Sequence, residues 1–156
     1  MLANALNAIE TPLRAMSVTL VPGGSIARVV AMVVTEPPMP IDMHMQTDLS
    51  RHFLLALHTE LLHVVRRAGL RRLAMPTLCT GGIGMPPDLV AEAIVRSWIN
   101  DLHNHPQDPL FVRIACYEAE HILCMMVSKD EGRSQLYCVR DEGTSLHAAE
   151  ASAEPC

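Results

Sequence analysis

The sequence predicts a single layered α/β domain with a largely parallel sheet, and three observations support this. Apolar, β-branched stretches alternate along the chain with longer segments whose apolar residues recur at helical spacing. Strong turn residues separate these segments. The third observation is size, because 156 residues, 49% of them hydrophobic, suffice for one core but hardly for two. We expect the domain to occupy residues 1–128, followed by a partly disordered extension over 129–156.

The amino-terminal part of the chain predicts two strands joined by a tight turn. Residues 17–21 and 26–34 are rich in β-branched side chains, and Pro22-Gly23-Gly24 separates the two stretches. The second stretch is apolar almost throughout, which is typical of a strand buried on both faces.

A long amphipathic helix is predicted from Asp48 to Ala68, because Thr47 or Asp48 can cap its start and Gly69 follows its last turn. The apolar face consists of Leu49, Phe53, Leu54, Leu57, Leu61, Val64, Val65 and Ala68. Two histidines, His58 and His63, lie five positions apart, whereas a zinc-binding helix needs a spacing of four. We therefore expect a solvated helix face there and no metal site.

The sequence after Gly69 predicts strands that alternate with helices, followed by one additional strand. In order, they are residues 71–77, 88–105, 110–116, 119–127 and 135–140. Strands joined by crossover helices form parallel sheets, whose ligands bind beyond the carboxyl ends of the strands. The tail from Thr144 is rich in Ala, Ser and Glu, a composition typical of disorder.

Composition and charge exclude several classes of function. A net charge of −5 and a sequence pI near 5.9 argue against nucleic acid or an anionic membrane as a partner. No apolar run approaches the roughly 20 residues of a transmembrane helix. The five cysteines contain no C-x-x-C pair, so neither a disulfide framework nor a zinc cluster is indicated. We expect a cytoplasmic or nuclear protein without metal or cofactor.

A glycine-rich turn connects the strand over 71–77 to the second helix. Three glycines in four positions remove Cβ atoms that would hold a ligand away from the backbone, and they permit positive φ angles that align successive N–H groups. Such a nest binds anions, and we expect the amides of residues 80–84 to make the contacts because Pro86 and Pro87 have no N–H. The candidate binding residues are Cys79, Thr80, Gly81, Gly82, Ile83, Gly84 and Met85.

The glycines alone fit a tight connection without any ligand equally well. No Lys or Arg follows them as a nucleotide-triphosphate loop requires, so triphosphate hydrolysis is not supported. A phosphatase-like thiolate at Cys79 would need a cation six residues later, where Met85 stands, and a small packing residue is the simpler interpretation of Cys79.

With its flanks, this turn closely resembles the second ligand loop of macro domains, the ADP-ribose-binding family. Residues 73–86 read Leu-Ala-Met-Pro-Thr-Leu-Cys-Thr-Gly-Gly-Ile-Gly-Met-Pro, and the family has an apolar strand ending in Pro, a Gly-Thr-Gly-like turn and a Gly-aromatic-Pro step into a helix. Cys79 and Met85 are mild departures, since a small residue and an aromatic residue are usual there. The resemblance extends over about residues 2–127 and implies a three-layer α-β-α sheet.

The resemblance also implies roles for individual residues. The amides from Gly81 to Ile83 would bind the diphosphate and the distal ribose, and Tyr117 would pack near the adenine. Residues 2–8 look like the helix that follows the family's first glycine-rich loop, so we expect the sheet to be incomplete on its N-terminal side. That loop, its asparagines and the acidic residue that recognises adenine carry much of the chemistry in hydrolytic members, so catalytic residues stay unassigned here.

Three functional hypotheses follow from these residues. The first is a module that binds ADP-ribose, free or attached to a protein. The second is an ADP-ribosyl hydrolase that removes ADP-ribose from modified proteins. The third is a truncated fragment that binds no ligand and acts through a partner, since an incomplete sheet has an open edge.

Overall fold

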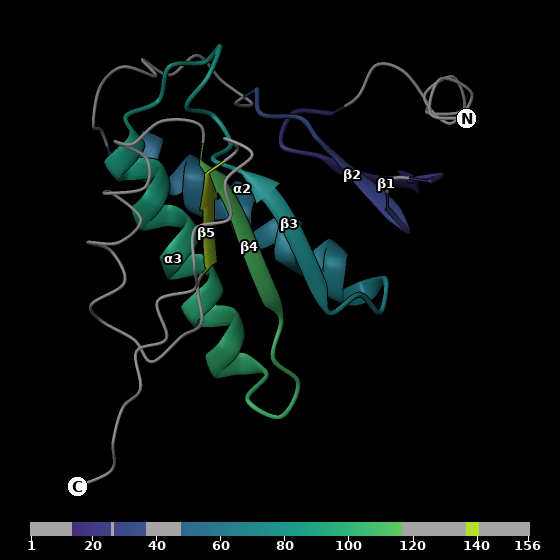
Figure 1. Ribbon diagram of the computed structural model, residues 1–156. Helices are drawn as coiled ribbons and strands as arrows, with labels where there is room; N and C mark the ends of the chain where they lie inside the picture. The colour runs from purple at the N-terminus through teal and green to yellow at the C-terminus, as the bar shows by residue number, and fades with distance from the viewer. Residues whose placement is uncertain (1–13, 26, 37–47, 117–136, 141–156) are drawn as a thin grey trace, which may run out of the picture.

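The computed structural model describes residues 14–25, 27–36, 48–116 and 137–140, and it confirms an α/β fold (Figure 1). Its elements are β1 (Val18–Pro22), β2 (Val29–Val33), α2 (Asp48–Arg67), β3 (Arg72–Pro76), α3 (Pro87–Asn104), β4 (Phe111–Cys116) and β5 (Tyr137–Arg140). The helix expected over 119–127, which belongs to the three-layer expectation, lies outside the described residues. Among the helices described, none is long and apolar enough to cross a membrane.

Strands β1 and β2 form the predicted hairpin, in which Val18 lies opposite Val33. The turn requires glycine at position 23, because a Cβ there would lie 2.2 Å from the carbonyl oxygen of Ala27. The expectation that β2 is buried on both faces is wrong, since all five of its residues are only partly buried. The physical reason is that, among the described strands, β2 pairs only with β1, so no larger sheet encloses it.

The second sheet has the order β3-β4-β5, and all three strands are parallel. Arg72 lies opposite Phe111, and Arg113 lies opposite Tyr137. β5 confirms the additional strand expected over 135–140. Because the strands are parallel, their carboxyl ends share one edge, and Figure 1 shows the loop that follows β3 at this edge.

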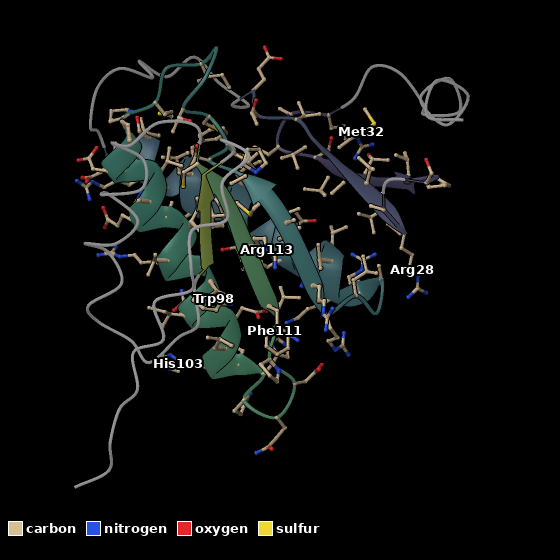
Figure 2. The ribbon with its side chains drawn as sticks, in the orientation of Figure 1. Arg28, Met32, Trp98, His103, Phe111 and Arg113 are labelled. Atoms are coloured by element: carbon tan, nitrogen blue, oxygen red, sulfur yellow. The ribbon has the colours of Figure 1, made fainter. Side chains whose placement is uncertain are left out.

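Helices α2 and α3 contact each other and cover one face of this sheet. Val112 and Ile114 of β4 point into the resulting core, whereas Phe111 on the opposite face is 50% exposed (Figure 2). Trp98 joins the second helix to the next strand, because its Nε1–H donates a hydrogen bond to the carbonyl oxygen of Leu110 at 3.0 Å. The core therefore lies between the two helices and the parallel strands.

Helix α2 ends as expected before Gly69, which has a φ of +69°. Its buried face nevertheless differs from the prediction at several positions: Ala68 is exposed and Val64 is only partly buried, whereas Ser50 and Leu62 are buried. Leu49 is 55% exposed, whereas His58, which we expected on a solvated face, is only 2% exposed. The prediction for His58 is wrong because this residue lies one turn after Leu54 and one turn before Leu61, on the same helical stripe as these buried leucines.

Candidate functional site

The glycine-rich loop occupies residues 77–86, between the end of β3 and the start of α3. Two buried side chains anchor it: Cys79 is 7% exposed and Met85 is 2% exposed, and both belong to the hydrophobic core. A hydrogen bond of 2.9 Å from the N–H of Met85 to the carbonyl oxygen of Cys79 closes the loop between these anchors. The residues between them thus form a short, fixed projection at the carboxyl edge of the sheet.

Hydrogen bonds within the loop involve some of its backbone amides but not all of them. The N–H of Gly84 donates to the carbonyl oxygen of Gly81 at 2.9 Å, and the N–H of Thr80 donates to that of Thr77 at 3.4 Å. The Thr80 hydroxyl also donates to the Thr77 carbonyl, at 2.8 Å. The amides of Gly81, Gly82 and Ile83 take no part in these backbone hydrogen bonds. The sequence suggested contacts from residues 80–84, and within the described residues no backbone hydrogen bond of the loop uses the amides of the central three.

The glycines at 81 and 82 are exposed, and a Cβ built on either would meet no atom within 4 Å. Neither residue has a positive φ angle. Packing and backbone conformation within the described chain therefore do not require glycine at these two positions. The space in front of them is open to an approaching molecule. Without a Cβ atom in the way, an anion can come close to the backbone N–H groups there.

The positive φ angles of the loop occur at its ends, at Gly84 (+74°) and Cys79 (+76°). The sequence indicated that the glycines would supply such angles, and only one of the three does so. An L-residue with a side chain, Cys79, adopts the other left-handed conformation, which is strained for any residue but glycine.

Burial raises the pKa of the Cys79 thiol to about 12, so the group stays protonated at neutral pH. A buried, protonated thiol is a poor nucleophile. This agrees with the interpretation of Cys79 as a packing residue. Tyr117, the expected adenine neighbour, lies outside the described residues, and within those residues no cluster of His, Cys, Asp or Glu could hold a metal ion.

A parallel sheet, a crossover helix from β3 to β4 and a glycine-rich loop at the carboxyl edge place the described part of the chain in the class of layered α/β domains, whose ligands usually bind at that edge. Among solved structures, the chain is similar to the Oceanobacillus iheyensis macrodomain with ADP, with a TM-score of 0.61 and 22% identity over 80% of this chain and 62% of that one. It is also similar to a mutant of that macrodomain with ADPR, with a TM-score of 0.61 and 21% identity over 81% of this chain and 63% of that one.

These similarities show that the fold of the chain is the macrodomain fold, as the resemblance of the glycine-rich loop implied. The chain spans about 62% of the length of the solved macrodomains that it matches. No protein-family model matches the sequence, and no curated protein matches it either.

Proposed function

We propose that the chain binds ADP-ribose, free or attached to a protein, and that its glycine-rich loop holds the diphosphate. The N–H groups of Gly81, Gly82 and Ile83 would donate to the phosphate oxygens. Charge-assisted hydrogen bonds of this kind contribute about 1.5–3 kcal/mol each. The shared fold supports the choice of ligand, because one similar macrodomain structure contains ADP and another contains ADPR.

One observation carries the assignment of the loop: two exposed glycines, with open space where a Cβ would stand, lie beside three amides that the loop's own backbone hydrogen bonds do not use. The buried anchors Cys79 and Met85 fix this segment before a ligand arrives. A preformed donor set loses little conformational entropy on binding. The negative charge of the whole chain makes such a local device necessary for an anionic ligand.

Binding is favoured over hydrolysis because of the side chains that the loop offers. Between residues 79 and 85, Cys79 is the only side chain that ionises, and burial raises its pKa to about 12. A protonated thiol with that pKa is neither a general base nor a nucleophile at neutral pH. The loop is therefore suited to holding phosphate groups through its backbone.

Calorimetric titration with ADP-ribose tests the proposal, with Gly82→Glu as the informative variant. The new carboxylate would occupy the phosphate position and repel it, so we expect affinity to fall at least about 30-fold, which corresponds to about 2 kcal/mol. Because a side chain at position 82 meets open space, the melting temperature should stay close to that of the wild type.

The matched control is Gln107→Glu, which adds the same charge on an exposed turn at the amino ends of the strands. We expect this variant to bind ADP-ribose with nearly wild-type affinity. Absence of heat from the wild type at millimolar ADP-ribose would refute the proposed ligand. Equal affinity of Gly82→Glu and wild type would refute the proposed place of binding.

A further inference from the structure

A hollow lined by side chains of α2 and α3 lies at the end of the parallel sheet opposite the glycine-rich loop. It is a cleft of about 620 Å³ between the last turns of α2 and α3, close to the amino ends of the parallel strands. His103, on the last turn of α3, lies at this end in Figure 2. The volume is within the range of about 300–1,000 Å³ that is typical of small-molecule sites.

A network of ion pairs forms one wall of the cleft. Arg66 donates to both carboxylate oxygens of Asp101, with a distance of 2.5 Å from Nη2 to Oδ2, and Nη1 donates to the carbonyl oxygen of Asp108 at 2.9 Å. Arg71 donates to the Asp108 carboxylate at 2.5 Å. The hydrogen bond with Asp101 is the main cause of a raised pKa at Arg66. Both carboxylates are therefore already paired with arginine.

Four further side chains that line the cleft can donate hydrogen bonds. Arg67 and His63 come from α2, and His103 and Asn104 come from α3; all four are exposed. None of the described residues forms an ion pair with Arg67. The guanidinium, imidazole and amide groups match the oxygens of phosphate, and arginine provides a planar fork for two of them.

The charge balance of the cleft also differs from that of the chain. Three arginines and two aspartates line it, which leaves one positive charge, whereas the whole chain carries −5. The carboxyl ends of α2 and α3 bring partial negative charge to the same place, and Arg66 and Arg71 are already neutralised by their ion pairs with Asp101 and Asp108. Arg67 then remains as the cation available to a ligand.

From these observations we propose that the cleft between α2 and α3 is a second binding site, for a small molecule that carries two or more phosphate groups. Arg67 and His63 hold one phosphate from α2, and His103 and Asn104 hold its neighbour from α3. This site is separate from the glycine-rich loop, so the chain has anion sites at both ends of its parallel sheet.

The test uses inorganic pyrophosphate and the Gly82→Glu chain, in which the glycine-rich loop cannot compete. Amide chemical shifts followed during titration should change in a saturable way at the last turns of α2 and α3. Arg67→Gln in this background should weaken pyrophosphate binding about tenfold, which is the loss expected for one charge-assisted contact.

The control is Arg96→Gln, which removes the same charge from an exposed part of α3, where Arg96 pairs with Glu92 at 3.0 Å. We expect its affinity to stay within about twofold of the parent, as is usual for an exposed pair. Equal weakening by both substitutions would mean unspecific attraction and would overturn the proposal, as would shifts that never saturate. Because the loop is blocked throughout, these outcomes do not depend on whether the wild type binds ADP-ribose.

Discussion

Replacing His58 with Leu is expected to stabilise the folded chain, although it removes a hydrogen bond. His58 donates from Nδ1–H to the carbonyl oxygen of Leu54 at 2.8 Å, which leaves Nε2 as a buried acceptor without a donor among the described residues. Apolar side chains such as Leu62 and Met75 line the small cavity of about 10 Å³ beside it. The imidazole therefore buries an unsatisfied polar atom in the core.

The magnitude follows from two opposing contributions. An unsatisfied buried acceptor costs about 1–3 kcal/mol, and the lost hydrogen bond contributed about 1 kcal/mol. The Leu54 carbonyl keeps its partner within the helix, because the backbone N–H of residue 58 still donates to it. Leu has nearly the volume of His, so we expect a net gain of about 1 kcal/mol.

The same substitution should change how stability depends on pH. Burial lowers the pKa of His58 below its ordinary value of 6.5. Between the folded-state pKa and pH 6.5, the imidazole is therefore protonated in the unfolded chain and neutral in the folded chain. The stability contributed by the neutral imidazole is complete above pH 6.5 and is lost as the pH falls toward the folded-state pKa, by at most about 1.4 kcal/mol per pH unit.

Urea denaturation of wild type, His58→Leu and the exposed control His63→Leu, each at pH 8 and pH 5.5, measures both effects. The difference in unfolding free energy between wild type and His58→Leu should widen at pH 5.5, while His63→Leu follows the wild type. Destabilisation by His58→Leu at pH 8, or an unchanged difference at pH 5.5, would refute the reasoning about the buried imidazole.

Two further substitutions test the loop anchor and the ion-pair network. At position 79, where φ is +76°, Cys79→Gly should be more stable than Cys79→Ala by about 1 kcal/mol in unfolding free energy, measured by urea denaturation, because only glycine is unstrained there. The control is Ala91 in α3, where we expect Ala91→Gly to be less stable than the wild type. If glycine were the more stable residue at both positions, the strain at Cys79 would be contradicted. Asp101→Asn should cost about 3 kcal/mol, because it leaves the nearly buried guanidinium of Arg66 with only the more distant carboxylate of Asp108, at 3.4 Å, as a charged partner. Glu92→Gln breaks the more exposed pairs with Arg51 and Arg96 and should cost less than about 1 kcal/mol by the same denaturation assay. Similar losses from Asp101→Asn and Glu92→Gln would argue against a special role for Arg66.

Local patterns in the sequence were sufficient to predict most of the elements. The period of apolar residues indicated α2 and α3, and Gly69 marked the end of the first of these helices. The glycines at 81, 82 and 84 identified the loop at the carboxyl edge. These features depend on neighbours within one or two turns, which a single sequence displays directly.

Features that depend on distant neighbours could not be predicted in the same way. The apolar run of β2 suggested complete burial, but burial depends on how many strands lie beside it. The pairing of Arg66 with Asp101 joins residues 35 positions apart, so neither the network nor the cleft beside it was visible in the sequence.

The single tryptophan provides an intrinsic fluorescent probe at an informative position. Trp98 is 4% exposed, bonds to the backbone just before β4 and lines the same small cavity as His58. We therefore expect its emission to report whether α3 remains docked on the sheet and to change when the neighbouring imidazole is protonated. The glycine-rich loop contains no aromatic residue, so tryptophan fluorescence can follow unfolding while calorimetry follows ligand binding as a separate signal.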